Sequence, residues 1–231
     1  MTSTAVVGST GLVGSHILST LLSLSSISSV YSISRRDPSS TNPKLHPLVD
    51  KDNSQWGTKL SSITPPPSIF FSALGTTRGA AGSVAAQRLI DYDLNLSLAQ
   101  TAKSSGVKVY VLISTGGANA KSMIAYPKMK GELEEKVKEL GFEHTVILRP
   151  GLIVGDRQES RPAEWVVRKI AGGMGMLGNS FVDFWAQDKE VIARAAVAAG
   201  LKALEGGESV PKLWEVGQSD IVKLGRTEWK A

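Results

Sequence analysis

The sequence contains no cysteine, and this absence excludes several classes of function together. None of the 231 residues can form a disulfide, act as a thiolate nucleophile or bind zinc through sulfur. Histidine is also scarce, since the chain has three, His16, His46 and His144, and none has metal-ligand spacing to another. We therefore expect an intracellular protein without a bound metal ion.

Long hydrophobic runs are lacking as well. A membrane helix needs roughly 18 to 20 consecutive apolar residues, whereas serine, glycine or charged residues interrupt every apolar stretch here. Residues 1–7 lead directly into an apolar run without the basic start and cleavage site of a secretory signal, so we expect a mature N-terminus. These features predict a chain that does not span a membrane.

The excess of positive charge is small and dispersed. The chain has 26 lysines and arginines against 21 acidic residues, which gives a formal net charge of +5. Such a balance suits nucleic acid, an anionic lipid surface or a phosphorylated ligand. Because the basic residues form no block or stripe, we expect no nucleic-acid partner.

Short β-branched segments alternate with segments of helical periodicity. The expected strands are residues 5–7, 30–33, 69–71, 107–113, 145–148 and 213–216, and the expected helices are 12–22, 85–103, 131–140 and 189–204. Proline and serine predict loops or turns at 37–47, 65–67 and 23–29. This alternation is typical of a Rossmann-type, doubly wound α/β fold, a mainly parallel sheet with helices on both faces.

The length and the 42% hydrophobic content suit a single domain over residues 1–231. Within it, residues 1–150 carry the regular alternation and form the expected cofactor-binding core. Residues 151–231 are less regular and are expected to shape a small substrate pocket and supply the last strand. A glycine-rich passage at 172–178 predicts either a flexible lid or a surface loop.

A glycine-rich motif follows the first expected strand and opens the first helix. Gly8 permits a tight turn, Gly11 lets the backbone approach a pyrophosphate, and Gly14 permits close packing of a helix whose N-terminal amides face the anion. We expect a dinucleotide here; the alternative is a turn that binds nothing. The loop is completed by Ser9, Thr10, Leu12 and Val13.

The end of the second expected strand favours NADPH over NADH. Rossmann proteins that prefer NAD place an acid at this position, whereas this chain has Ser34, Arg35 and Arg36. Guanidinium groups form charge-assisted bonds with a 2′-phosphate. The alternative is a solvated strand end partly neutralised by Asp37. Asp50 is interpreted equally well as an adenine contact or as a surface acid.

A candidate catalytic set follows the strand expected at residues 107–113. Ser114 ends that strand, and Tyr126 and Lys130 follow four residues apart on one helical face. Pro127 is tolerated only in a first helical turn, which places Tyr126 near the helix start, at the carboxyl end of the sheet. The alternative is that Tyr126 is a packing residue.

This set suits carbonyl reduction. A free tyrosine has a pKa of about 10 and is poorly matched to proton donation at neutral pH. A lysine cation about 4 Å away supplies roughly 4 kcal/mol at an effective dielectric of about 20, equal to about 3 pKa units. Tyr126 is thus the expected acid, Lys130 the pKa tuner and ribose anchor, and Ser114 the group that polarises the substrate oxygen by a hydrogen bond.

The glycine loop and the Tyr-Lys pair resemble the short-chain dehydrogenase/reductase superfamily, in its atypical branch. Longer segments are similar to the fungal mitochondrial-outer-membrane short-chain-dehydrogenase-like family, which is related to the animal Tat-interacting oxidoreductase. They are GSTGLVG, SALGTTRG, YPKMKGELEEKVKEL, LRPGLIVGDRQESRPAEW and VGQSDIVKLGRTEW. The resemblance covers nearly the whole chain.

The resemblance implies a Rossmann fold, bound NADPH or NADP+, and peripheral residence on the cytosolic side of the mitochondrial outer membrane. It implies that Leu74, Gly75 and Thr76 line the cofactor. It also implies an approach to the nicotinamide end by Arg149, Pro150, Gly151 and Ile153. From the residues alone, Gly75 is expected as a strand-end turn and Pro150 as a strand terminator.

One position departs from the superfamily pattern. The usual catalytic asparagine has no clear counterpart, and Asp91 or Asn95 lies in that region. Three functions therefore stay open: an NADPH-dependent reductase of a small or medium carbonyl compound, an NADPH-sensing adaptor with protein partners and little turnover, and an isomerase that uses the tyrosine as acid. The sequence decides neither the substrate nor between a monomer and a homodimer.

Overall fold

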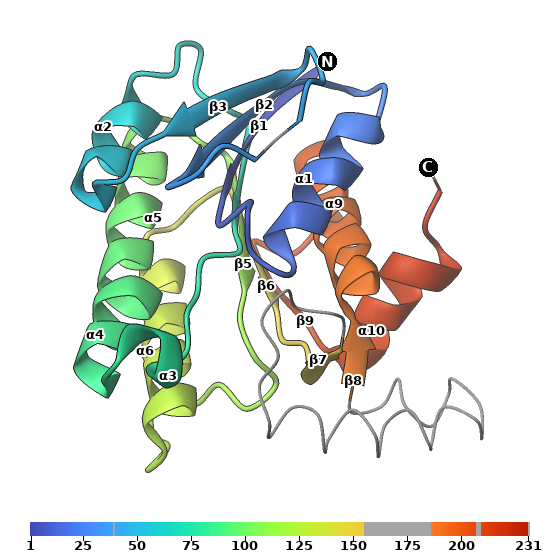
Figure 1. Cartoon of the computed structure of the whole chain (residues 1–231). Coiled ribbons are helices and arrows are strands. Elements are labelled where there is room, and N and C mark those ends of the chain that lie inside the picture. Colours follow the sequence, from blue (N-terminus) through green and yellow to red (C-terminus); the bar gives the residue numbers. More distant parts are fainter. Residues whose placement is uncertain (39, 155–185, 207–208, 231) are drawn as a thin grey trace.

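The computed structural model describes residues 1–38, 40–154, 186–206 and 209–230. Seven parallel strands form one sheet, with helices on both of its faces (Figure 1). Across the sheet the order is β3 (Leu45–Val49), β2 (Ile27–Ser34), β1 (Thr2–Val7), β4 (Ile69–Ser72), β5 (Val109–Ile113), β6 (His144–Leu148) and β9 (Leu213–Val216). The predicted fold class is confirmed.

The central strands are buried along their whole length. Every residue of β4, β5 and β6 is buried, because helices cover both faces of a parallel sheet. This environment explains why these strands read as continuous apolar runs rather than as alternating patterns. Sequence such as Ile69-Phe70-Phe71 therefore predicts a strand at the centre of the sheet and not at its edge.

Two hydrophobic layers enclose the sheet. On one face, α1 (Gly14–Ser23) packs beside α9 (Lys189–Gly206), and on the other α2 (Trp56–Ser61), α5 (Asn95–Ser104) and α6 (Ala125–Glu139) lie in a row (Figure 1). The helices α10 (Gln218–Val222) and η4 (Lys223–Thr227) pack on α9. Among the helices of the described residues, none has both the length and the hydrophobicity that crossing a bilayer requires.

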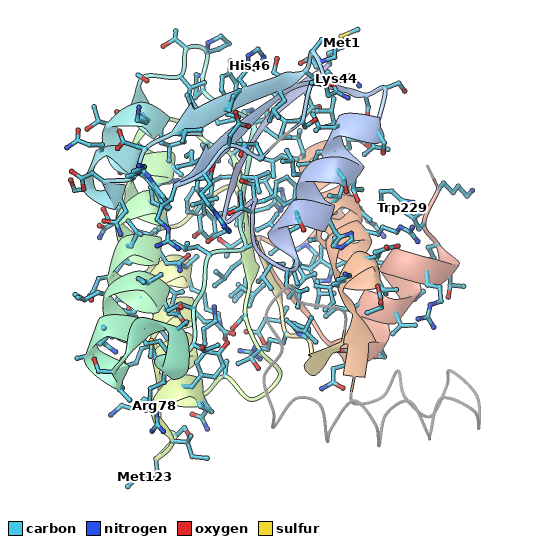
Figure 2. The ribbon with its side chains drawn as sticks, viewed as in Figure 1. Met1, Lys44, His46, Arg78, Met123 and Trp229 are labelled. Atoms are coloured by element: carbon cyan, nitrogen blue, oxygen red, sulfur yellow. The ribbon has the colours of Figure 1, made fainter. Side chains whose placement is uncertain are left out.

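Shorter elements complete the described chain. They are η1 (Asn53–Gln55), α3 (Arg78–Ala81), α4 (Val84–Arg88), the π-helical turn η2 (Leu89–Leu94), and the two strands of a separate small sheet, β7 (Leu152–Val154) and β8 (Ala186–Asp188). Arg78 and Met123, which follow β4 and β5, lie at one end of the molecule, and Met1, which precedes β1, lies at the other (Figure 2). The carboxyl ends of the strands therefore share the end marked by Arg78 and Met123.

Four sequence predictions need correction. The turn expected at residues 23–29 is wrong at its end, because β2 begins at Ile27. The loop expected at residues 37–47 is wrong at its end, where Leu45, His46 and Pro47 belong to β3; an edge strand tolerates proline because one row of its amides has no strand partner. The single helix expected at 85–103 is interrupted by the π-helical turn η2. The strand expected at 107–113 begins at Val109.

Within the part of the chain that the structure describes, one buried side-chain polar atom, the Tyr110 hydroxyl, has no hydrogen-bond partner. The Tyr110 ring stacks between Phe70 and Phe142, at centroid distances of 5.6 and 5.1 Å. Its hydroxyl is buried and has no hydrogen-bond partner among the described residues. Burial raises the pKa of Tyr110, so the hydroxyl stays protonated.

We predict that Tyr110→Phe leaves the free energy of unfolding unchanged or raises it by about 1 kcal/mol, because an unsatisfied buried hydroxyl costs about that much. Urea unfolding of both proteins measures the difference. Phe70→Leu is the control, since it alters the same stack without removing a polar atom and should destabilise the chain. A loss above about 1 kcal/mol in Tyr110→Phe would show that the hydroxyl is paired.

Candidate functional site

The glycine loop lies between β1 and α1, where backbone segments approach closely. Gly8 has a φ of +78°, and a Cβ there would lie 2.6 Å from the Ala73 carbonyl oxygen at the end of β4. A Cβ on Gly14 would lie 2.1 Å from the Gly8 carbonyl oxygen. The Gly11 amide donates to that same oxygen at 2.9 Å. Any side chain at Gly8 or Gly14 would force the turn, the helix and the sheet apart.

The same loop presents an uncapped helix end. Val13 precedes α1 and provides no side-chain cap, and the first turn of α1 contains no acid. Ser9 is buried and its hydroxyl lies 2.6 Å from that of Ser32 in β2, which fixes the loop on the sheet, while Thr10 and Gly11 are exposed and Leu12 is half-buried. These are the features of an anion-binding turn at the switch point between β1 and β4.

The two predicted arginines lie at the carboxyl end of β2. Arg35 and Arg36 are exposed, and Ser34 donates to the Arg36 carbonyl at 2.6 Å, which fixes the turn that carries them. Asp50 follows the neighbouring strand β3, and its amide donates to the Ser34 carbonyl at 3.0 Å. The Asp50 carboxylate lies 3.4 Å from the ammonium group of Lys59 in α2. It also accepts a hydrogen bond from the Asp52 amide at 3.0 Å, so both of its contacts are to residues that follow β3.

The loop after β4 is held by two buried side chains from the helical segment η2–α5. The Thr76 amide donates to Asp91 at 2.6 Å, and Asn95 donates to the Leu74 carbonyl at 3.2 Å. Asn95 also donates to the carbonyls of Ile90 and Asp91 and accepts from Ser72. Leu74 and Thr76 are half-buried and Gly75 is exposed.

The two candidates for the missing asparagine therefore differ in role. Every polar atom of the Asn95 side chain is engaged in holding the loop to the helix, which is a structural role. The carboxylate of Asp91 accepts from Thr76 and from Gln87 and also interacts electrostatically with Lys130. Burial raises the pKa of Asp91 above its ordinary value, although these hydrogen bonds and Lys130 oppose the rise.

The candidate catalytic residues lie at the end of β5 and in the first half of α6. Lys130 is 3% exposed, and its ammonium group donates to the Ile113 carbonyl at 2.9 Å. Burial lowers the pKa of Lys130, while Asp91 and Glu134 act in the opposite direction. Tyr126 lies in the first turn of α6, as predicted from Pro127, and is 40% exposed. Ser114 is buried and directly follows Ile113, whose carbonyl accepts the Lys130 hydrogen bond.

A buried carboxylate that the sequence analysis did not single out completes the group. The Ser114 hydroxyl donates to Glu134, which is 2% exposed on α6. Arg149 donates to the same carboxylate, with Nη2 at 2.5 Å, and its Nη1 reaches Glu215 at 2.7 Å. The only signal in the sequence is that Glu134 stands four residues after Lys130, on the same face of the helix.

The remaining predicted residues follow β6. Arg149 does not project freely toward a ligand, because Glu134 and Glu215 hold its guanidinium. Pro150 is buried and its carbonyl accepts the Gly116 amide at 2.7 Å, while the Gly151 amide donates to Gln187 at 2.6 Å. Ile153 packs against the core. The lid or loop predicted at residues 172–178 lies outside the described residues.

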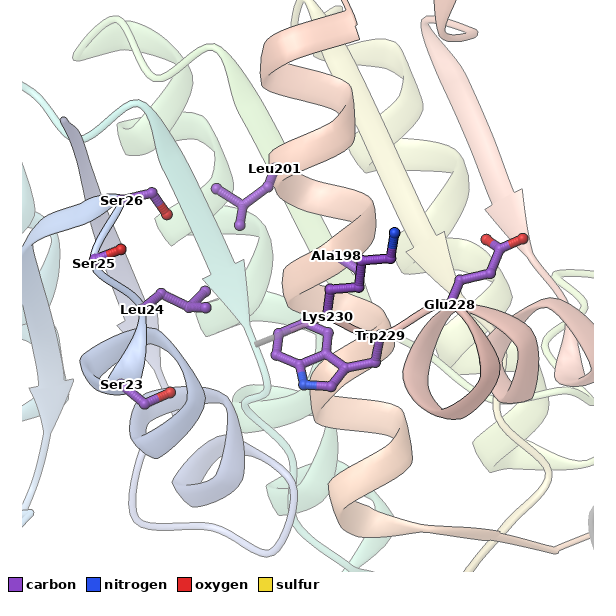
Figure 3. Close-up of a pocket in the computed structure, with 9 residues that line it drawn as sticks. All are labelled: Ser23, Leu24, Ser25, Ser26, Ala198, Leu201, Glu228, Trp229 and Lys230. Atoms are coloured by element: carbon purple, nitrogen blue, oxygen red, sulfur yellow. The ribbon is translucent and has the colours of Figure 1, made fainter.

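A cavity of about 460 Å³ lies elsewhere, at the amino edge of the sheet (Figure 3). The turn that follows α1, the outer face of α9 and the segment after η4 enclose it, with Leu24, Leu201, Trp229 and Lys230 among its lining residues. Ligands of doubly wound folds bind at the carboxyl ends of the strands. This cavity is therefore separate from the candidate site.

The sheet order and the glycine turn at the switch point define a Rossmann-type fold. Comparison with solved structures agrees on the fold. The Bordetella bronchiseptica enzyme WbmH, in complex with NAD+, superposes with a TM-score of 0.67 at 17% identity over 94% of this chain and 75% of that chain. A UDP-N-acetylglucosamine 4-epimerase from Methanobrevibacter ruminantium gives 0.65 at 17% identity, over 87% and 73%.

Sequence comparison identifies the family. The HIM1 family model matches residues 40–174. The Aspergillus fumigatus "Protein fmp52, mitochondrial" is 56% identical over 97% of this chain and 99% of its own length, and the Emericella nidulans protein of the same name is 53% identical over 98% and 100%. This chain therefore belongs to the HIM1 family, and the resemblance to a fungal mitochondrial group is confirmed by these relatives.

The buried carboxyl group of Asp91 makes a pH-dependent contribution to stability. Its pKa is raised in the folded chain, so between the ordinary value of 3.8 and the raised value the folded state holds a proton that the unfolded state has lost. Folding stability from this group therefore falls as the pH rises through that window, and stays low above it. We predict that Asp91→Asn removes this loss.

Urea unfolding at a series of pH values from about 4 to 8 tests this prediction, because the stability of Asp91→Asn relative to the native chain should rise across the range. A constant offset is expected from changed hydrogen bonds to Thr76 and Gln87. Asp93→Asn is the matched control, since Asp93 is exposed on the same helical turn. Parallel pH profiles for Asp91→Asn and the native chain would contradict the prediction.

Proposed function

We propose that this chain binds NADPH at the carboxyl edge of its sheet and reduces a carbonyl group with Tyr126 as acid. The observation that carries the proposal is the position of Lys130, buried at the end of β5 one helical turn after Tyr126. A buried ammonium group on the tyrosine's own helix face stabilises the phenolate.

The residues present fit a dinucleotide. The close backbone approach at Gly8 and Gly14 and the uncapped start of α1 suit a pyrophosphate, and Arg35 and Arg36 suit a 2′-phosphate. The NAD+ bound to WbmH supports a nicotinamide dinucleotide as the ligand class. When bound, NADPH supplies the hydride.

The chain's own residues then divide the remaining work. Tyr126 donates its phenolic proton to the substrate oxygen, and Lys130 stabilises the phenolate that is left and holds the cofactor ribose. Ser114 lies beside the same strand end and contacts the substrate. Burial lowers the pKa of Lys130, and the nearby Asp91 and Glu134 act against that lowering.

Two observations favour a second candidate, an NADPH-sensing adaptor with little turnover. The Ser114 proton is directed to Glu134 rather than outward, and Tyr126 is 40% exposed. The mitochondrial names of the relatives support a mitochondrial location for this chain. Peripheral attachment to the outer membrane, a protein partner, a homodimer and a link to the animal Tat-interacting oxidoreductase all stay predictions.

Replacement of the arginines tests the cofactor preference. We predict that Arg35→Ala and Arg36→Ala each weaken NADPH binding by roughly tenfold or more and leave NADH binding nearly unchanged, because each removes a charge-assisted contact to the 2′-phosphate. Titration of NADPH and NADH fluorescence measures both affinities. Lys212→Ala, an exposed site preceding β9, is the control for net charge. Equal losses for the two nucleotides would contradict the assignment.

Replacement of the tyrosine tests the chemistry. We predict that Tyr126→Phe lowers NADPH consumption with aldehydes, quinones or ketones by about 10²- to 10⁴-fold, as expected for loss of a general acid, while NADPH affinity is retained. Tyr31→Phe, on β2, is the control and should keep full activity. Equal rates in the native chain and Tyr126→Phe would refute the assignment. Tight NADPH binding without turnover in the native chain would favour the adaptor.

A further inference from the structure

Ser114 has a single hydroxyl proton, and the structure shows where it goes. A serine hydroxyl donates one hydrogen bond and accepts two. The Ser114 hydroxyl donates to Glu134, so toward any other neighbour it offers lone pairs. A carbonyl oxygen is also an acceptor, so it cannot hydrogen-bond to the Ser114 oxygen while the Ser114 hydroxyl donates to Glu134.

Glu134 is fixed as an acceptor by its other contacts. Arg149 donates to both carboxylate oxygens, through Nε at 3.2 Å to each and through Nη2 at 2.5 Å to one. Glu215 accepts from Arg149 at 2.7 Å and from Lys138 at 2.6 Å. These four charged side chains alternate in sign, and each contact between them joins a cation to a carboxylate.

The backbone of Ser114 is equally fixed. Its amide donates to the Leu148 carbonyl at 2.8 Å, and the preceding carbonyl, of Ile113, accepts the Lys130 ammonium. Ser114 therefore cannot turn away from Glu134 by a shift of the strand end. The hydroxyl is held at the carboxyl edge of β5, beside the residues that carry the proposed chemistry.

We propose that Glu134 is a positioning residue that acts through Ser114 and selects a substrate with a hydroxyl on the carbon next to its carbonyl. The reacting carbonyl oxygen takes its hydrogen bond from Tyr126. The neighbouring hydroxyl donates to Ser114, whose hydroxyl oxygen accepts no hydrogen bond from the residues that the structure describes. The substrate class is thus an α-hydroxycarbonyl compound, an inference that rests on the proposed function.

Two ketones that differ by one hydroxyl group test the proposal, acetophenone and α-hydroxyacetophenone. Their affinities for the complex of the protein with NADPH are measured through NADPH fluorescence. We expect the native complex to bind the hydroxylated ketone about tenfold more tightly, the effect of one hydrogen bond. Ser114→Ala should reduce this ratio to about one while keeping the contact between Glu134 and Arg149.

Glu134→Gln gives a second test. The amide oxygen can accept from Arg149 while the amide nitrogen donates to Ser114, which releases the Ser114 proton toward the substrate. The ratio should therefore fall or reverse, whereas the exposed neighbour variant Glu135→Gln should keep it. If Glu134→Gln does not fold, the result with Ser114→Ala decides.

The outcomes separate this proposal from the proposed reductase. An affinity ratio near one in the native complex, including undetectable binding of both ketones, would overturn the α-hydroxycarbonyl preference, as would a ratio that Ser114→Ala leaves unchanged. A ratio that follows the prediction while no NADPH is consumed would reject the reductase and leave the binding preference standing.

Discussion

The close contact between Gly14 and the Gly8 carbonyl determines how α1 leaves the sheet. Because a Cβ at Gly14 would lie 2.1 Å from that oxygen, the helix start can sit directly on the turn. Gly8 is in turn pressed against Ala73 at the end of β4. The carboxyl ends of β1 and β4 and the start of α1 can therefore lie together because two side chains are missing.

Three ionisable side chains are buried at the same edge of the sheet, and burying them costs free energy. Lys130, Glu134 and Asp91 are each 3% exposed or less, and desolvation disfavours the charged forms of Lys130 and Asp91. Their mutual interactions offset part of that cost, and removing one partner would leave the others uncompensated. Such clusters are typical of functional sites, although structural ion-pair networks share the property. Arg149, Glu215 and Lys138 extend this cluster toward the last strand, which makes part of it structural.

Local signals predicted the parts of the fold that local forces determine. The apolar runs of β4 and β5 and the proline in the first turn of α6 were sufficient, because burial and the missing proline amide act at those positions themselves. Pro47 led to the wrong prediction of a loop, because a proline fits in β3 only through the position of that strand at the edge of the sheet. The turn η2 was not predictable either, because it depends on Asp91 and Asn95 reaching the loop after β4.

In the candidate site, too, local sequence predicts some residues and tertiary contacts determine the others. Ser114, Tyr126 and Lys130 were identified from spacing, because a strand end and one helix turn place them. Glu134 was not, since a glutamate on a lysine-rich and glutamate-rich helix looks solvated until β6 brings Arg149 against it. That tertiary contact places a carboxylate where it accepts the hydrogen bond of the Ser114 hydroxyl, more than half a helix away from Tyr126. The residue type at position 114 thus sets which hydrogen bonds are available, and its buried neighbours set which of them a substrate meets.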